Sequence, residues 1–263
     1  MAEVGAVYDL SPVPRTPVDI LARSDEGGDT TPAPVAKGTW LLASVVEDSA
    51  AVVDKLFDEA ERRDPAHRRT WVALVDGNNH QIERIGTEGR ARGVEVSVVI
   101  DFVHVLEYLW RAAWSSYDEG DPDAETWVQD KARAVLAGQA GRVAAAIRRE
   151  ATYHGPAAAV RANADTGATY LTNKVPHLDY PEALTHGWPI ATGVIEGACR
   201  HLVKDRMDLT GARWGLDGAK AVLKLRALRS NGDFPGYWRY HLAQERQRTH
   251  EQRYTNNTIP HAA

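Results

Sequence analysis

The sequence predicts an α/β fold, and three observations favour this class. Two apolar runs rich in β-branched residues, at 71–75 and 94–100, each end on an aspartate, as buried strands do when their last residue delivers a carboxylate to a sheet edge. A polar helical segment separates these runs, which gives the strand–helix–strand order of a parallel or mixed sheet with right-handed crossovers. From Val103 onward the apolar spacing becomes helical, which predicts an all-helical insertion after the sheet.

The first third of the chain supplies the other predicted strands. Residues 2–10 partly alternate and indicate a strand, and residues 11–38 contain five prolines, which indicates a long loop with a mobile acidic middle. Residues 38–46 indicate the next strand. Asp48 or Ser49 can cap a helix that runs to about Arg63, where Asp64-Pro65 stops it. Together with the two strands that end on an aspartate, these elements make a predicted sheet portion over residues 1–104. A short helix near 79–90 and a turn at Gly93 connect the strands at 71–75 and 94–100.

The remaining elements are helical. Residues 105–190 form the predicted insertion, with helices to about Arg149 and irregular connections between 153 and 189. Thr192 is a plausible N-cap for the next helix, which places Glu196 in its first or second turn and Arg200 and Lys204 on the same stripe. A helix at 217–229 completes the C-terminal helices of residues 191–240, and the polar tail at 241–263 is expected to fray.

Composition limits the class of protein. The 263 residues are 43% hydrophobic and 25% charged, which is typical of a globular chain, and the net charge of −5 means that any polyanion contact needs a local positive patch. The single cysteine, Cys199, excludes a disulfide framework and a cysteine-cluster zinc site, and it fits a reducing cytoplasm. No run is long and apolar enough to span a bilayer, so we expect a cytoplasmic protein without a membrane partner.

The acids at the strand ends suggest metal chemistry. Asp76, Asp101 and Glu196 are hard oxygen ligands suited to Mg²⁺ or Mn²⁺. Two such ions can activate a water or a 3′-hydroxyl and stabilise the leaving oxygen of a phosphodiester. The basic residues that follow Glu196 could then hold a DNA backbone against the metals, and they are Arg200, Lys204, Arg206 and Arg213.

Each of these residues also has a structural interpretation. An aspartate before glycine, as in Asp76-Gly77, is more often a turn former than a ligand. Asp101 and His104 could cap the helix that follows, and Glu196 with Arg200 could be a helix salt bridge worth only about a few tenths of a kcal/mol. The basic residues between 200 and 229 could be a solvated face. Three histidines of the insertion are too scattered to indicate a metal set: His154, His177 and His186.

Four segments in this order resemble a known family. They are Val75-Asp76-Gly77-Asn78, the run from Ile100-Asp101-Phe102-Val103-His104 to Leu109, Thr192-Gly193-Val194-Ile195-Glu196-Gly197-Ala198-Cys199-Arg200-His201 and Arg206-Met207-Asp208-Leu209-Thr210-Gly211-Ala212-Arg213-Trp214. The sequence resembles the C-terminal portion of an insertion-sequence transposase of the DDE, RNase H-like kind, and the Kra-type insertion sequences are the most similar group. The resemblance covers most of residues 2–240, and its last two segments are the specific ones.

The resemblance implies a fold and a set of roles. It implies an RNase H-like mixed sheet, incomplete at the N-terminus, with an all-helical insertion and C-terminal helices. Asp76 would be the second metal ligand and Glu196 the third, with Mg²⁺ or Mn²⁺ bound, while Asp101 and His104 support the site. Arg200, Lys204, Arg206, Arg213 and Trp214 would contact DNA. The family's first catalytic Asp would precede residue 1, because nothing near Asp9 resembles its motif, so we expect a truncated and impaired enzyme.

Three functions follow as hypotheses. The first is metal-dependent DNA strand cleavage and transfer at insertion-sequence ends, with a homo-oligomer as a further expectation. The second is a non-catalytic remnant that binds DNA or a partner through its basic C-terminal helices. The third is another metal-dependent nuclease or phosphatase on an α/β sheet, which would need Asp76, Asp101 and Glu196 to converge.

Overall fold

The computed structural model describes residues 2–22, 30–155, 157–191 and 193–250. The described chain is mixed α/β, with small sheets and many helices, as the sequence predicts at this coarse level. Two expectations, the mobile acidic middle of the first loop and the N-cap at Thr192, fall mainly on residues outside these ranges. The chain forms two compact units: the first draws on residues up to 8, 38–52 and from 194 onward, and the second on residues 9–37 and 53–193.

The strands lie where the sequence predicts them, but their pairing is different. Strands β1 (Glu3–Leu10) and β2 (Ala36–Ser44) pair in one sheet, and β3 (Trp71–Val75) and β4 (Val96–Ile100) pair in another. The β3–β4 pair is parallel, with Trp71 opposite Val96 and Val75 opposite Ile100. Within the described residues the strands thus form two two-stranded sheets rather than the expected single mixed sheet. Local periodicity identifies a strand without identifying the neighbour it bonds to.

In the second unit, apolar side chains pack on both faces of β3 and β4. On one face, Val53 and Phe57 of α2 (Ser49–Arg63) and Ile85 of α3 (Asn79–Arg92) form a cluster with alternate residues of the sheet: Trp71, Ala73, Val75, Val96 and Val98. On the other face, Val72, Leu74 and the buried Val99 and Ile100 join the main core. Burial on both sides explains why these strands are continuous apolar runs without polar alternation.

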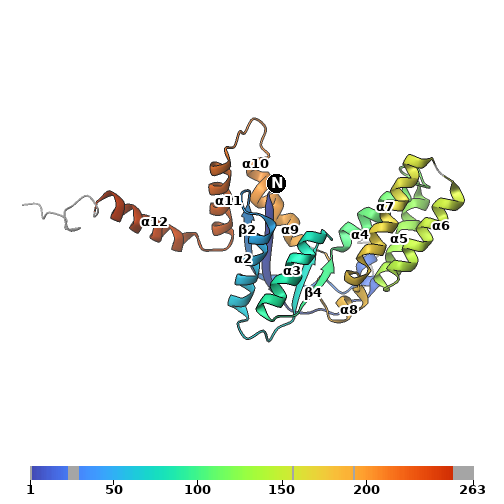
Figure 1. Ribbon diagram of the computed structural model, residues 1–263, viewed down its shortest axis with the longest axis horizontal. Coiled ribbons are helices and arrows are strands. Elements are labelled where there is room, and N and C mark those ends of the chain that lie inside the picture. Colours follow the sequence, from blue (N-terminus) through green and yellow to red (C-terminus); the bar gives the residue numbers. More distant parts are fainter. Residues whose placement is uncertain (1, 23–29, 156, 192, 251–263) are drawn as a thin grey trace, which may run out of the picture. The chain divides into compact units, whose positions relative to one another are not determined.

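Four helices of the second unit surround that main core. They are α4 (Phe102–Ala113), α5 (Pro122–Leu136), α6 (Ala140–His154) and α7 (Ala158–Lys174). Each helix contacts the next, and α7 returns to contact α4, so the four lie side by side (Figure 1). Val105, Leu109, Val135, Ile147 and Leu171 are almost fully buried among them. Because this core is continuous with Ile100 of β4, the insertion helices and the β3–β4 sheet share one unit, and the division expected at residue 104 does not coincide with the unit boundary.

Short helices complete the second unit. The elements are α1 (Pro17–Leu21), the 3₁₀ turn η1 (Val175–His177) and α8 (Tyr180–Thr185). Tyr180 of α8 is fully buried, donates its hydroxyl to the carbonyl of Ile100 at 2.8 Å and meets the ring of Phe102 edge-on. This contact fixes the chain where β4 ends and α4 begins.

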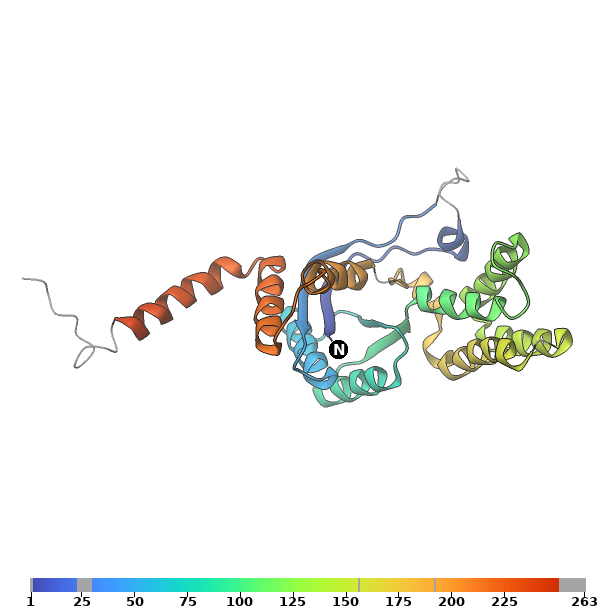
Figure 2. The same ribbon diagram turned by 90° about the horizontal axis from the view of Figure 1, so that it is seen from above.

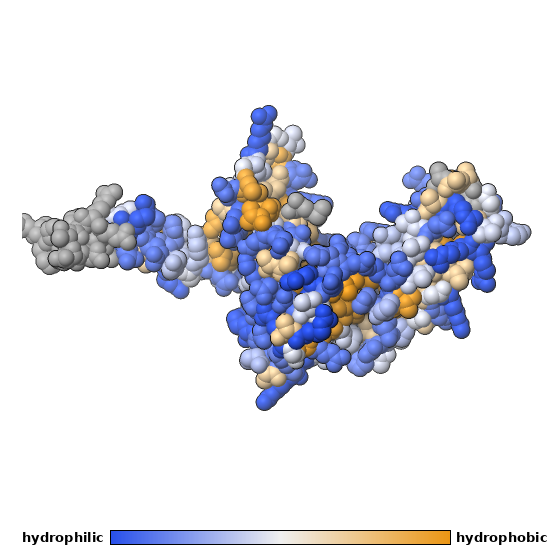
Figure 3. Space-filling model, viewed as in Figure 1, coloured by the Kyte–Doolittle hydropathy of each residue, from blue (hydrophilic) through white to orange (hydrophobic). Residues whose placement is uncertain are grey.

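The first unit is built around β1 and β2, which pair as the two blue strands near the N-terminus (Figure 2). Ala43 of β2 packs with Leu202 of η2 (Cys199–Lys204) and Leu223 of α11 (Leu216–Ser230). The side chain of Asn231 accepts from the amide of Leu41 at 2.8 Å and donates to its carbonyl at 3.0 Å, as a strand partner would. Hydrophobic side chains also reach the surface around α11 (Figure 3), where Leu216 is exposed. The helices α9 (Gly193–Ala198) and α10 (Asp205–Met207) flank η2.

The last described helix includes the first part of the polar tail that the sequence predicts at 241–263, and residues 251–263 of that tail lie outside the described ranges. Helix α12 spans Phe234–Thr249, so residues 241–249 are helical, although none of its residues is buried. Pro235 stands in its first turn, where proline is favourable, and the following Gln, Glu and Arg residues are good helix formers. No helix of the described chain is long and apolar enough to cross a membrane.

Candidate functional site

Asp76 stands at the carboxyl end of β3, in a tight turn. Its carboxylate accepts a hydrogen bond from the backbone amide of Asn78 at 2.8 Å, and Gly77 follows with a φ of +94°. A Cβ on Gly77 would lie only 2.9 Å from the hydroxyl of Tyr170, so both the left-handed backbone and the close contact favour glycine. The turn interpretation of Asp76-Gly77 is thus confirmed, and it leaves the Asp76 side chain exposed at the sheet edge.

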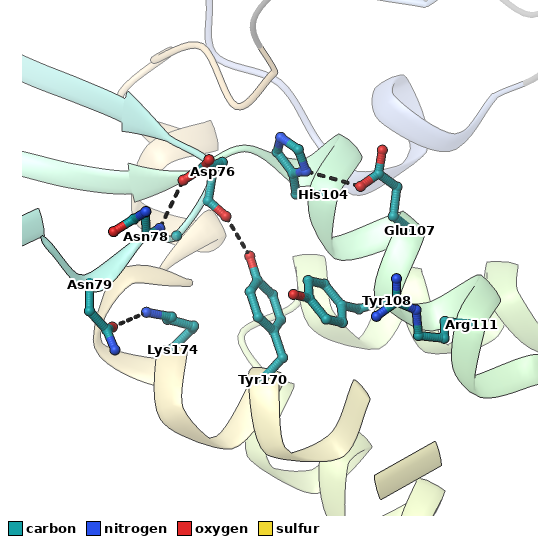
Figure 4. A pocket seen from close by; sticks show the side chains of 10 residues that line it. Asp76, Asn78, Asn79, His104, Glu107, Tyr108, Arg111, Tyr170 and Lys174 are labelled. Carbon is teal, nitrogen blue, oxygen red and sulfur yellow. Dashed lines mark hydrogen bonds and ion pairs between the residues drawn. The ribbon is translucent and has the colours of Figure 1, made fainter. Parts of the chain in front are cut away.

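A pocket of about 380 Å³ opens beside this turn (Figure 4). Three parts of the second unit contribute to it. The turn after β3 and the start of α3 give Asp76 to Asn79, α4 gives His104, Glu107, Tyr108 and Arg111, and α7 gives Tyr170 and Lys174. The pocket therefore lies at the carboxyl end of a parallel strand, where ligand groups of open α/β sheets collect.

Two tyrosines form the wall between α4 and α7. The rings of Tyr108 and Tyr170 stack with centroids 3.7 Å apart and an angle of 13° between their planes. The guanidinium of Arg111 lies 5.4 Å from the ring centroid of Tyr108, in a cation–π contact. Tyr170 donates its hydroxyl to the carbonyl of Asp76 at 3.1 Å. Burial, reinforced by the nearby Tyr108 and Asp76, raises the pKa of Tyr170, so its hydroxyl stays a hydrogen-bond donor.

Lys174 enters the pocket from the last turn of α7. The residue is 6% exposed, and its ammonium donates to Oδ1 of Asn79 (Figure 4). Burial, together with the positive charge of Lys174, lowers the pKa of His177. The hydrogen bond to Asn79 positions the ammonium of Lys174, but the neutral amide does not cancel its positive charge.

Asp101 and His104 occupy the start of α4. Asp101 is the N-cap: its carboxylate accepts from the amide of Val103 at 2.8 Å, and the residue is only 3% exposed. Its own amide donates to the carbonyl of Val75 at 2.8 Å, which continues the β3–β4 pairing by one bond. The capping interpretation of Asp101 is confirmed, whereas His104 is partly exposed and contacts the carboxylate of Glu107 at 3.0 Å.

Glu196 and the basic residues belong to the first unit. Glu196 is exposed on α9, and the helix changes at Cys199–Lys204 to a π-helical stretch. The wider turn changes the angular spacing, so the predicted stripe of Glu196, Arg200 and Lys204 does not follow regular α-helical geometry. Although both residues are described, Glu196 and Arg200 form no ion pair. Each predicted DNA contact is exposed, namely Arg200, Lys204, Arg206, Arg213 and Trp214.

The acids of the pocket do not make a metal site by themselves. Among the residues that the structure describes, no three His, Cys, Asp or Glu side chains are grouped to hold a metal ion. In the second unit, Asp101 is committed to its helix cap and Glu107 to His104. The exposed carboxylate of Asp76 is a suitable hard ligand. Because further ligands are not assembled around it, the side chains of this pocket do not by themselves form a Mg²⁺ site.

The sequence did not predict four of the residues that line the pocket as site residues: Tyr108, Arg111, Tyr170 and Lys174. Tyr170 contacts a carbonyl 94 residues earlier in the chain, and helical periodicity alone does not reveal such a pairing. The relation of Tyr170 to Lys174 at i+4 does place both on one helix face.

Comparisons with known proteins do not assign the chain to a family. No family model, no curated protein and no solved structure matches the chain.

Proposed function

We propose that this chain carries part of the catalytic core of a DDE-type insertion-sequence transposase and acts on DNA. The observation that carries the proposal is the exposed carboxylate of Asp76, held by an Asp-Gly turn at the carboxyl end of a parallel strand and opening on a polar pocket. The order of the Asp76, Asp101-x-x-His104 and Glu196 segments along the chain supports it. The RNase H-like topology is part of the proposal.

The proposed roles are those that the resemblance to DDE transposases implies. Asp76 and Glu196, both exposed acids, are the proposed ligands of Mg²⁺ or Mn²⁺. Such ions supply charge stabilisation and an activated oxygen nucleophile for phosphodiester chemistry when bound. Asp101 positions the start of α4 by capping it, and His104 faces the pocket from the first turn of that helix. Arg200, Lys204, Arg206 and Arg213 supply phosphate contacts, and Trp214 lies beside them in the sequence.

The direct test is nicking of supercoiled plasmid DNA by the purified chain in Mg²⁺ or Mn²⁺. We expect weak, metal-dependent nicking that disappears in Asp76→Asn and in Glu196→Gln. Asp130→Asn is the matched control, because Asp130 is an exposed acid of α5 paired with Arg133 and lies outside the pocket lining. Nicking that survives both site substitutions would contradict the assigned roles.

A second candidate is DNA binding without catalysis. It is favoured by the exposed cations of the first unit and by the absence of a three-acid group among the described residues. In this case the chain binds duplex DNA with a steep salt dependence, Asp76→Asn changes nothing, and no nicking occurs. Failure to nick and to bind DNA would overturn both candidates. The third function, another metal-dependent nuclease or phosphatase that uses Asp76, Asp101 and Glu196 together, is less favoured because Asp101 is buried as a helix cap.

A further inference from the structure

The starting observation is a buried lysine without a counter-ion. Lys174 is 6% exposed, and no carboxylate of the described residues lies within 4.0 Å of its ammonium. Its one hydrogen-bond partner in the described chain is the neutral amide oxygen of Asn79. Lysines are almost never buried unless they are paired, because an uncompensated buried charge is unfavourable. An anion bound from outside the chain would compensate the charge of Lys174.

A second cation lies in the same pocket. Arg111 is exposed at the rim, where its guanidinium lies over the ring of Tyr108, and it makes no ion pair within the described part of the chain. The ring stack of Tyr108 on Tyr170 and the cation–π contact both limit the freedom of Arg111. A planar guanidinium held in this way presents several donors to an oxyanion.

The acids of the pocket have other partners. Asp76 accepts from the amide of Asn78, and the Glu107 side chain is 64% exposed and contacts His104. Neither carboxylate is within ion-pair distance of Lys174 or Arg111. Burial and then the positive charge of Lys174 lower the pKa of His177, three residues further along the chain.

We propose that the pocket beside Asp76 is an anion site that binds a phosphate group, with Lys174 as its main ligand and Arg111 as the second. Lysine and arginine donors are the usual partners of phosphate oxygens, and about 380 Å³ accommodates a phosphate with part of a nucleotide. The proposed anion site depends only on the burial of Lys174, the position of Arg111 and the shape of the pocket. That the phosphate belongs to a nucleic acid rests on the proposed function.

The test is calorimetric titration of the full chain with inorganic phosphate at constant ionic strength, with EDTA present and chloride as the reference anion. We expect phosphate to bind and Lys174→Met to weaken binding by roughly tenfold or more, because a charge-assisted hydrogen bond to a buried cation is lost. Arg111→Met should weaken binding by a smaller factor, and because Arg111 is exposed this variant should fold. Lys131→Met is the matched control, since Lys131 is paired with Glu150 and lies outside the pocket lining.

The outcomes separate the inference from the proposed function. Absence of phosphate binding, or affinity unchanged by both Lys174→Met and Arg111→Met, would overturn the anion site even if the chain nicks DNA. Binding that depends on these residues supports the site even if metal-dependent nicking fails, because EDTA removes the metal from this experiment. If a 5′-phosphorylated dinucleotide displaces the bound phosphate, the natural ligand is the phosphate of a nucleic acid. If the dinucleotide does not displace it, the natural ligand is free phosphate. Binding of an unphosphorylated nucleoside with no phosphate binding would overturn the proposal.

Discussion

At the scale of single residues, one of the most heavily hydrogen-bonded carboxylates of the described chain lies outside the pocket. Asp64 follows α2 and accepts three hydrogen bonds: from the amide of Arg68 at 3.0 Å, from the amide of Arg69 at 2.9 Å and from the indole of Trp71 at 3.1 Å. The two backbone amides are the main reason that the pKa of Asp64 lies below its ordinary value of 3.8. The sequence identified Asp64-Pro65 as a helix stop, whereas the carboxylate also orders the loop that leads into β3.

The lowered pKa of Asp64 gives a pH prediction. Because the folded-state pKa is below the unfolded value, the stabilisation is present above pH 3.8 and is lost as the pH falls through the folded pKa. Asp64→Asn should lower the free energy of unfolding at neutral pH, and the difference from wild type should shrink at about pH 3. Urea unfolding at the two pH values measures this. Asp118→Asn, at an exposed acid, is the control, and a deficit that stays constant with pH would contradict the prediction.

At the scale of elements, much of the fold follows from local signals. The apolar runs predicted β3 and β4, Asp48 accepts from the amide of Ala51 at 2.8 Å as expected for the start of α2, and Gly93 ends α3 with a φ of +66°. Such signals are readable because each depends on residues a few positions apart. The turn and cap roles of Asp76 and Asp101 are local in the same sense.

Other elements were missed for identifiable reasons. Helix α1 starts with a capping box between Thr16 and Asp19, a short signal hidden among prolines. The same carboxylate of Asp19 accepts hydrogen bonds from the backbone of Thr31 and from Thr16, and these bonds lower its pKa to about 2. The π-helical stretch at Cys199–Lys204 carries no distinctive composition. The pocket wall from α7 depends on long-range packing, and a single sequence contains no direct record of such packing.

The cap at Asp101 gives a stability test of the Asp101-x-x-His104 segment, which is interpreted either as a helix cap or as part of the functional site. Asp101→Ala should reduce the free energy of unfolding by about 1–2 kcal/mol, because the amide of Val103 loses its acceptor at the start of α4. Asp101→Asn keeps an acceptor oxygen and should retain most of that stability. Chemical denaturation of both variants measures the effect, with Asp121→Ala, which removes the cap of α5, as a comparison. Equal losses in the Asn and Ala variants would show that the negative charge, and not the cap, is what the fold requires.

At the scale of the whole molecule, the charge distribution bears on the proposed contact with DNA. The net charge is −5, which opposes general attraction to a polyanion. The exposed cations predicted to contact DNA lie between residues 200 and 213, so the proposed contact depends on a local patch and not on the average charge. Composition could establish this need for a patch, and only the structure establishes that these side chains are exposed.

The same reasoning predicts the salt dependence of DNA binding. A variant with Arg200, Lys204, Arg206 and Arg213 all changed to alanine should bind a short duplex more weakly. The slope of log affinity against log salt should also become shallower by about 0.9 for each phosphate that the variant no longer neutralises, because each cation that neutralises a phosphate releases counter-ions. Fluorescence anisotropy across a salt series measures the slope. Arg142→Ala, at an exposed arginine of α6, is the control and should leave the slope unchanged. An unaltered slope in the fourfold variant would exclude these residues as the phosphate ligands and would place DNA binding, if it occurs, on another surface.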